Sequence, residues 1–210
     1  MFGQPQTFDT TTLDLIRHGE PEGGVRYRGS VDDPLCHRGW EQLRNSTSQS
    51  GCRWNAVFSS PMLRCHAFAS ALSQQQQIPL TVIDGLRELC FGTLEGLTPE
   101  QAWQQYPELL TKLWQDPAGH TPPEGEPYSD FLARVSESLD QVITAAKNQH
   151  VLLVVHGGVI RAALTYLLNI QPSDTFCFEV PYAGMTRLKI YTDQAGRRNT
   201  ALTFANRYQG

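Results

Sequence analysis

The feature that most constrains the fold is a run of apolar residues, Val151–Val155 (VLLVV), that leads directly into His156 and two glycines. A short apolar run rich in β-branched residues is typical of a strand buried on both faces of a parallel sheet. The helical pattern of Val159–Leu168 begins just after the glycines. Because parallel strands are joined by crossover connections that are usually helices, this strand–turn–helix unit predicts an α/β fold.

The rest of the chain repeats this alternation of strands and helices. Shorter apolar segments predict further strands at Leu13–Ile16, Ala56–Ser59, Leu80–Ile83, Thr186–Tyr191 and Ala201–Phe204. Helical patterns occupy Arg38–Gln49, the stretch from Ser60 to about Gln75, and Phe131–Ala146. Together these elements predict a three-layer αβα sandwich around a mostly parallel central sheet.

One region interrupts the alternation and divides the expected domain. Residues 92–127 are rich in Gly, Pro and Trp, with two short helical stretches near Pro99–Tyr106 and Glu108–Gln115. Such a segment between regular units predicts a short helical cap over one end of the sheet. Residues 1–11 are polar and are expected to form a flexible tail, which leaves residues 12–210 as a single domain.

Composition excludes several classes of partner. The net charge of −4 argues against a nucleic-acid partner. The chain has no apolar run of the roughly 18 residues that a membrane span requires, and its first residues do not resemble a secretory signal. Five unclustered cysteines suggest reduced thiols, so we expect a cytoplasmic protein. Cys65, next to Arg64, is either a reactive thiol or a small buried filler.

Polar side chains follow the predicted strands at the points where those strands end. His18 follows the first strand, and His156 follows the strand at Val151–Val155. Because ligands of such sheets bind at the carboxyl ends of the strands, we expect these side chains to meet there. A single bound anion would give all of them a partner, whereas burying each one alone would cost free energy. The residues expected to meet are Arg17, His18, Arg64, Glu88 and His156.

This set of side chains suits phosphoryl transfer. That reaction needs a nucleophile in line with the leaving oxygen, cations on the phosphoryl oxygens and an acid for the leaving oxygen. Arg17 and Arg64 supply guanidinium groups, which bind phosphate in a bidentate manner. His18 can attack through one ring nitrogen if a carbonyl accepts the proton of the other.

Other groups complete the predicted site. Glu88 is the candidate acid, and it would then activate the water that attacks in the second step. His156, if protonated, would donate to the phosphoryl group. Gly157 and Gly158 open a helix, so their N–H groups are expected to face the anion.

Several segments resemble the signature segments of the histidine phosphatase superfamily, which includes the cofactor-dependent phosphoglycerate mutases. They are Leu15–Glu20 (LIRHGE), Tyr27–Gly29, Ser59–Arg64, Leu86–Gly96 and Val155–Gly158. The resemblance implies a phosphohistidine at His18, phosphate binding by Arg17, Arg64 and His156, proton transfer by Glu88, and no metal or other cofactor. From the same segments we expect substrate contacts by Arg17, Tyr27, Arg28, Arg64 and Gly157.

The predicted cap bears on the substrate. Mutases of this superfamily usually carry two adjacent arginines in the cap, whereas this cap has Lys112, Leu113 and Trp114, which favours hydrolysis. The short cap and overall size resemble the branch that includes α-ribazole-5′-phosphate phosphatases of cobalamin biosynthesis. Trp103, Tyr106 and Trp114 would then contact an aromatic base, or else form the small core of the cap.

Alternative functions remain open. Within the superfamily they are a broad-specificity sugar-phosphate phosphatase and a phosphoglycerate mutase. Outside it they are a metal hydrolase and a non-catalytic, phosphate-binding regulatory module. The chain has no HExxH motif, and we interpret His37, His66, His120 and His150 as ordinary surface or helix residues. The expected partner is a small phosphomonoester, with neither nucleic acid nor membrane, and a homodimer is one option for the assembly.

Overall fold

The most apolar run of the sequence, Val151–Val155, forms a strand at the centre of the sheet, as predicted. In this computed structural model, which describes residues 8–51 and 53–207, the strands form one six-stranded sheet with the order β3-β2-β4-β1-β5-β6. The strands are β1 (Asp9–Arg17), β2 (Ala56–Ser59), β3 (Leu80–Val82), β4 (His150–Val155), β5 (Met185–Thr192) and β6 (Arg198–Arg207).

The sheet is mostly parallel, which confirms the predicted fold class. β4 pairs in parallel with β1 on one side and with β2 on the other, and β3 extends the parallel part beyond β2. β5 is antiparallel to β1, and β6 is antiparallel to β5. The register aligns Arg17 with Val155, so the residues that follow β1 and β4 emerge side by side at one edge.

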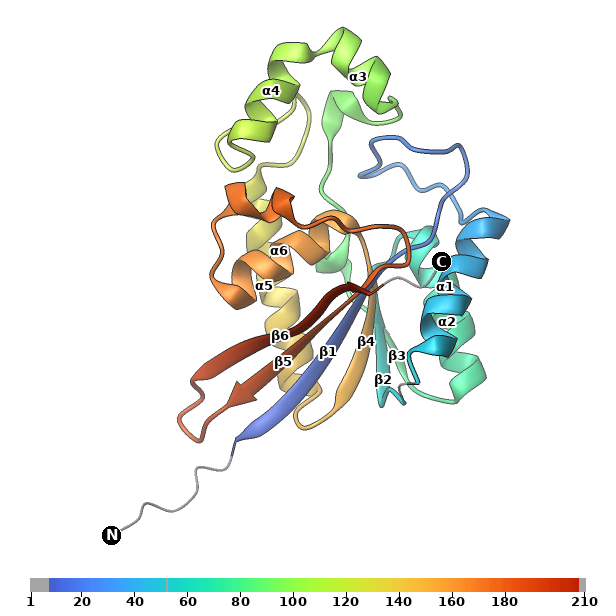
Figure 1. Cartoon of the computed structure of the whole chain (residues 1–210), viewed down its shortest axis with the longest axis vertical. Helices are drawn as coiled ribbons and strands as arrows, with labels where there is room; N and C mark the ends of the chain where they lie inside the picture. Colours follow the sequence, from blue (N-terminus) through green and yellow to red (C-terminus); the bar gives the residue numbers. More distant parts are fainter. Residues whose placement is uncertain (1–7, 52, 208–210) are drawn as a thin grey trace.

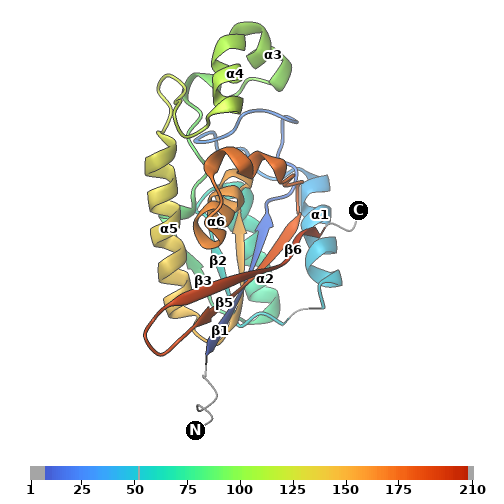
Figure 2. The ribbon, with the colours of Figure 1, turned by 60° about the vertical axis from the view of Figure 1, so that its left-hand side comes forward.

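Helices cover both faces of the sheet (Figures 1 and 2). They are α1 (His37–Gln49), α2 (Leu63–Gln76), α3 (Pro99–Gln105), α4 (Pro107–Gln115), α5 (Tyr128–Ala145) and α6 (Gly157–Leu168), with short 3₁₀ helices η1 (Asp84–Leu86), η2 (Gly92–Leu94) and η3 (Pro172–Cys177). None of the described helices is both long enough and apolar enough to cross a membrane.

Two buried clusters alternate across the central strands, as side chains of a strand must. Leu15 and Leu153 face the cluster that α5 and α6 complete, whereas Ile16 and Val154 face the cluster that includes side chains of α1 and α2. Each central strand is therefore apolar on both faces, which explains the continuous apolar runs in its sequence.

Some element boundaries differ from the sequence prediction. α2 begins at Leu63 rather than at Ser60, because Met62 at its N-cap has an extended backbone and the Ser60 hydroxyl accepts a hydrogen bond from the Met62 N–H. α5 begins at Tyr128, three positions before the expected start, directly after Pro127 at its N-cap. The sequence analysis did not predict η3.

The expected flexible tail is too long by three residues, because β1 already begins at Asp9. The Asp9 carboxylate pairs with Lys147 Nζ at 2.8 Å and accepts a hydrogen bond from Asn148 Nδ2 at 2.7 Å. The Thr10 N–H donates to Asn148 Oδ1. These contacts hold the start of the strand, while the first part of the predicted tail, residues 1–7, lies outside the described residues.

The cap lies beyond one end of the sheet, where α3 and α4 stand above the other helices (Figure 1). It has its own small core around Leu94, Ala102 and Leu110. A capping box at Thr98 and Gln101 begins α3, since each side chain accepts a hydrogen bond from the other residue's backbone N–H. The cap thus forms around short helices with local caps rather than as a loose loop.

A buried ion cluster joins β1, β4 and β5 away from the cap. The Asp14 side chain is fully buried and accepts hydrogen bonds from Arg187 Nε (2.7 Å), from Trp54 Nε1 (2.8 Å) and from the ring of His150 (2.8 Å). Burial raises the pKa of Asp14, but these hydrogen bonds outweigh it and lower the pKa below 3.8. The interpretation of His150 as an ordinary surface or helix residue is therefore wrong, because it is a partly buried strand residue bound to a carboxylate.

We expect Asp14→Asn to lower the free energy of unfolding at pH 7 by about 3 kcal/mol, because it removes the buried carboxylate charge to which the Arg187 guanidinium donates two hydrogen bonds. The carboxylate stabilises the fold fully above 3.8, its unfolded pKa, and this contribution is lost as the pH falls through the lower folded pKa. Urea unfolding of both proteins between pH 7 and pH 3 measures the difference, which should shrink in acid. Asp84→Asn is the control, since Asp84 pairs with Arg87 but its side chain is 79% exposed. Equal stability of wild type and Asp14→Asn at pH 7 would contradict the expectation.

Candidate active site

His18 lies directly after β1 with its ring oriented for nucleophilic attack. Its Nδ1 lies 2.7 Å from the Gly19 carbonyl oxygen. Because a carbonyl can only accept, Nδ1 carries the ring proton and Nε2 keeps its lone pair. Gly19 packs so closely against α1 that a Cβ there would lie 2.0 Å from the Gly39 carbonyl oxygen. That contact requires glycine at this position and fixes the carbonyl that orients the ring.

His156 lies beside His18, as the parallel pairing of β1 and β4 requires. The two ring centroids are 5.3 Å apart in an edge-to-face arrangement. His156 Nε2 lies 2.7 Å from the Ser60 hydroxyl oxygen at the end of β2. Three neighbouring strands thus bring the two imidazoles and this serine together at one edge of the sheet.

Both imidazoles are neutral in the ligand-free protein. Burial, followed by the charges of Arg17 and Arg64, holds the pKa of His18 well below 6.5. Burial and the charge of Arg64 do the same to the pKa of His156. A neutral His18 is ready to attack at pH 7. The sequence analysis gave His156 a donor role if it were protonated, and the lowered pKa disfavours that form, but a neutral imidazole still offers one N–H.

Arg17 and Arg64 lie near the two imidazoles, and each has a guanidinium N–H group that is not hydrogen-bonded within the described residues. Arg17 donates from Nη1 to the Val180 carbonyl at 2.6 Å, and its guanidinium lies 4.1 Å from the centre of the Tyr182 ring. Arg64 is fully buried and donates to the Val31 carbonyl at 2.8 Å. The Nε atoms of both arginines are buried, and no described residue forms a hydrogen bond with either of them. Unpaired buried donors are costly, so the site is built to receive an anion.

Glu88 is held at the start of α6. Its Oε2 accepts the Gly158 N–H and its Oε1 accepts the Leu89 N–H, each at 3.0 Å. A Cβ at Gly158 would lie 2.2 Å from Glu88 Oε1, so a larger residue there would displace the carboxylate from this position. The expectation that the Gly158 N–H faces the substrate anion is therefore wrong, because the Glu88 carboxylate already occupies that donor. Gly157 does line the pocket.

Arg134 of α5 braces the segment that carries Glu88. Its guanidinium donates to the carbonyls of Gly85 (2.8 Å), Arg87 (2.7 Å) and Glu88 (3.1 Å). It also donates to both carboxylate oxygens of Glu126, at the end of the cap. One side chain therefore links the acid segment, the cap and α5. The sequence analysis did not assign it this part, because the carbonyls it binds leave no mark on the sequence.

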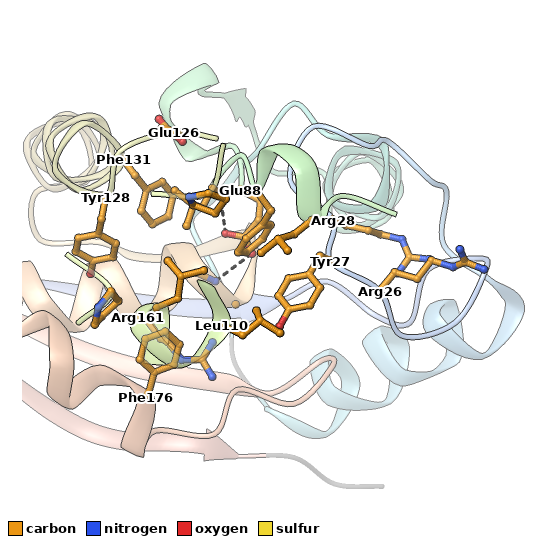
Figure 3. A pocket seen from close by; sticks show the side chains of 18 of the residues that line it. Arg26, Tyr27, Arg28, Glu88, Leu110, Glu126, Tyr128, Phe131, Arg161 and Phe176 are labelled. Carbon is orange, nitrogen blue, oxygen red and sulfur yellow. Dashed lines mark hydrogen bonds between the residues drawn. The ribbon is translucent and has the colours of Figure 1, made fainter. Parts of the chain in front are cut away.

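A cavity of about 350 Å³ is lined by His18 and by cap residues that include Leu110 and Trp114. Figure 3 shows this pocket from close by. The predicted site residues that line it are Arg17, His18, Tyr27, Arg28, Glu88 and Gly157. Arg64 and His156 are fully buried and lie behind this lining. Arg28 lines the cavity, and its nitrogens also donate to Asp33, Gly24 and Glu22, which braces its loop. Its expected substrate contact stays a prediction.

The three aromatic residues of the cap that the sequence analysis considered together, Trp103, Tyr106 and Trp114, have different surroundings in the structure. Trp114 lines the cavity, with its ring centroid 5.4 Å from that of Phe176. Tyr106 packs into the cap core, whereas Trp103 is exposed and does not line the cavity. His120 does line the cavity, so its interpretation as an ordinary surface residue is wrong.

Sequence reasoning also missed part of the pocket wall. The missed lining residues with polar or aromatic side chains include Arg161, Phe176, Tyr128 and Tyr182. A signal was available for Arg161, because it is the one charged residue in the otherwise apolar sequence of α6. Cys65 proves to be a buried filler, since it is fully buried and burial raises the pKa of its thiol.

Comparison with known proteins agrees with this geometry. The sequence profile of the histidine phosphatase superfamily (branch 1) matches residues 13–201. The chain belongs to this superfamily. It is a phosphatase-type enzyme, as the resemblance of its segments implies.

Individual relatives span several activities. A 2,3-bisphosphoglycerate-dependent phosphoglycerate mutase of Rhizobium etli is 29% identical over 194 residues, which cover 87% of this chain and 92% of that protein. A bifunctional protein of Mycobacterium tuberculosis is 32% identical over 189 residues, but the match covers only 52% of its length and 88% of this chain. The structure of an alpha-ribazole phosphatase from Shigella flexneri superposes with a TM-score of 0.76 at 26% identity, covering 93% of this chain and 96% of that one.

Proposed function

We propose that this enzyme hydrolyses small phosphomonoesters through a phosphohistidine at Nε2 of His18. The observation that carries the proposal is the hydrogen bond from His18 Nδ1–H to the Gly19 carbonyl, 2.7 Å long, which leaves Nε2 unprotonated. The unpaired Nε atoms of Arg17 and Arg64 support the same conclusion, because they offer donors to a phosphoryl group.

In the first step Nε2 of His18 attacks phosphorus, and the bond from phosphorus to the ester oxygen breaks. Arg17, Arg64 and an N–H of His156 stabilise the charge on the phosphoryl oxygens. Glu88, in its protonated form, gives its proton to the departing oxygen, so the alcohol leaves neutral. The product is a phosphohistidine with Glu88 as a carboxylate.

In the second step water takes the place of the alcohol. The Glu88 carboxylate removes a proton from the water as its oxygen attacks phosphorus. The bond from phosphorus to Nε2 breaks, and its electron pair returns to His18. Inorganic phosphate leaves, and Glu88 is protonated again for the next cycle.

For the substrate we propose α-ribazole 5′-phosphate. The support is the cavity wall, where Phe91, Trp114 and Phe176 offer aromatic surface for a flat base beyond the phosphate site. The likeness to the alpha-ribazole phosphatase of Shigella flexneri points the same way. Cobalamin biosynthesis is part of this proposal. The cap sequence disfavours a mutase, because it lacks two adjacent arginines.

The test is a kinetic screen of phosphomonoesters with the purified protein. It includes α-ribazole 5′-phosphate, 3-phosphoglycerate, fructose bisphosphate and a generic aryl phosphate, with and without a metal chelator. We expect chelator-insensitive turnover, with α-ribazole 5′-phosphate giving the highest kcat/KM. No turnover of any ester would favour the regulatory module, and loss of activity on chelation would favour the metal hydrolase. A higher kcat/KM for 3-phosphoglycerate or fructose bisphosphate would reject the proposed substrate.

A further inference from the structure

One arginine of the pocket wall takes no part in the reaction described so far. Arg161 projects from α6 into the cavity, and Figure 3 shows it close to Phe176. Its Nη2 donates to the Phe178 carbonyl at 3.2 Å, and its guanidinium carbon lies 5.4 Å from the centre of the Phe176 ring. Its Nε is buried without a hydrogen-bond partner. Arg161 therefore has a buried donor that the described part of the protein does not use.

The surroundings of Arg161 place it between the phosphate site and the outer cavity. A Cβ on Gly157 would lie 3.5 Å from Arg17 Nε and 3.6 Å from Arg161 Nη1, so the two guanidiniums flank the same point at the start of α6. Glu88 is bound to the next residue, Gly158. Arg161 thus adjoins both a predicted phosphate ligand and the group that would protonate the leaving oxygen.

The charge of Arg161 is not matched by a protein ion pair. None of the ion pairs in residues 8–51 and 53–207 includes it. Burial lowers its pKa, although the Glu88 charge acts in the opposite direction. Much of the nearby wall is apolar, with Phe131, Leu110 and Phe176 among its residues. An unused guanidinium donor in such a wall is costly unless a ligand supplies an acceptor.

We propose that Arg161 binds an oxygen acceptor on the carbon next to the phosphoester carbon of the leaving group. The proposal rests on the proposed function, because Arg17 must hold the phosphoryl group for Arg161 to face the leaving group. The pocket then selects phosphomonoesters with a hydroxyl, ether or carboxylate oxygen at that place. Pentose 5-phosphates satisfy this requirement through the ring oxygen. Simple alkyl phosphates do not satisfy it.

The test compares two esters that differ only in that oxygen, 2-hydroxypropyl phosphate and propyl phosphate. For wild type we expect kcat/KM to be about tenfold to a hundredfold higher for the hydroxylated ester, as a hydrogen bond to a charged group allows. Arg161→Met should bring the ratio close to one, and Arg161→Lys should restore part of it. Arg26→Met is the matched control and should keep the wild-type ratio, because Arg26 also lines the cavity but donates to the Gly23 and Gly96 carbonyls.

Each result bears on a separate claim. A wild-type ratio near one, or an unchanged ratio in Arg161→Met, would overturn the assignment of Arg161. The ratio measured for wild type tests the assignment of Arg161 even if the variant fails to fold. A thermal melt and turnover of an aryl phosphate would reveal a variant that fails to fold. Absence of aryl phosphate turnover by wild type would instead overturn the proposed function. In that event, competitive binding of the two esters measures the same preference without catalysis.

Discussion

His18→Ala is expected to lower kcat/KM for every phosphomonoester by at least about 10³-fold, because it removes the atom that forms the covalent intermediate. The ring centroid of His18 lies 5.3 Å from that of His156, and its Nδ1 is fixed by the Gly19 carbonyl, so Nε2 is the ring nitrogen left for attack. Steady-state kinetics with an aryl phosphate measures the loss. Intact-protein mass spectrometry after rapid quenching should show one added phosphoryl group on wild type and none on the variant.

The control for this substitution is His37→Ala. The His37 side chain is 87% exposed at the start of α1, where it lies 3.7 Å from Glu41. The same change of residue there should leave kcat/KM unchanged. If His18→Ala kept more than about a hundredth of the wild-type rate, His18 would not be the nucleophile, since covalent catalysis contributes several kcal/mol.

Glu88→Gln is expected to slow alkyl phosphates by about 10²- to 10⁴-fold, which is the usual contribution of a general acid. An alkoxide needs a proton in order to leave, whereas a nitrophenolate does not. The first turnover of nitrophenyl phosphate should therefore be slowed much less. Gln keeps one oxygen for the hydrogen bond from the Gly158 N–H but cannot also accept the Leu89 N–H. Loss of that contact would slow both kinds of ester, so the difference between alkyl and aryl esters reports proton transfer.

Rapid-quench kinetics separates the two steps of this variant. With nitrophenyl phosphate we expect a burst of nitrophenol followed by accumulation of phosphohistidine, because the variant lacks the base that activates water. Glu100→Gln, an exposed change in α3, is the control and should behave as wild type. Equal slowing of the first step with alkyl and aryl esters would count against Glu88 as the acid.

The parallel sheet and the place of the site could be predicted from the sequence because both leave local marks. The apolar run at Val151–Val155 reflects a strand buried on both faces, and the glycines after His156 mark the turn into α6. Carboxyl ends of parallel strands share one edge. The position of His18 after β1 and of His156 after β4 therefore indicated that the two imidazoles would meet.

Other features could not be predicted because they join residues with no common local pattern. Asp14 meets Arg187 across 173 positions of the chain and His150 across 136. No pattern in the sequence near His150 indicates that Asp14 is its partner. The same reason explains why the contacts of Arg28 within its own loop were not predicted, since its carbonyl partners are visible only once the loop is folded.

The sequence by itself determined the fold class, the family and the strand ends at which the candidate site residues meet, because hydrophobic periodicity and the residues that end each strand are local properties. Only the tertiary structure decided that Glu88 occupies the Gly158 N–H and that Trp114 rather than Trp103 lines the cavity. It also decided that the Arg161 Nε has no hydrogen-bond partner among the described residues. These facts depend on the rotation of α6, the seating of the cap and the packing of the surrounding loops. These three arrangements depend on many contacts between segments that are distant in the sequence, so no single stretch of the chain determines them.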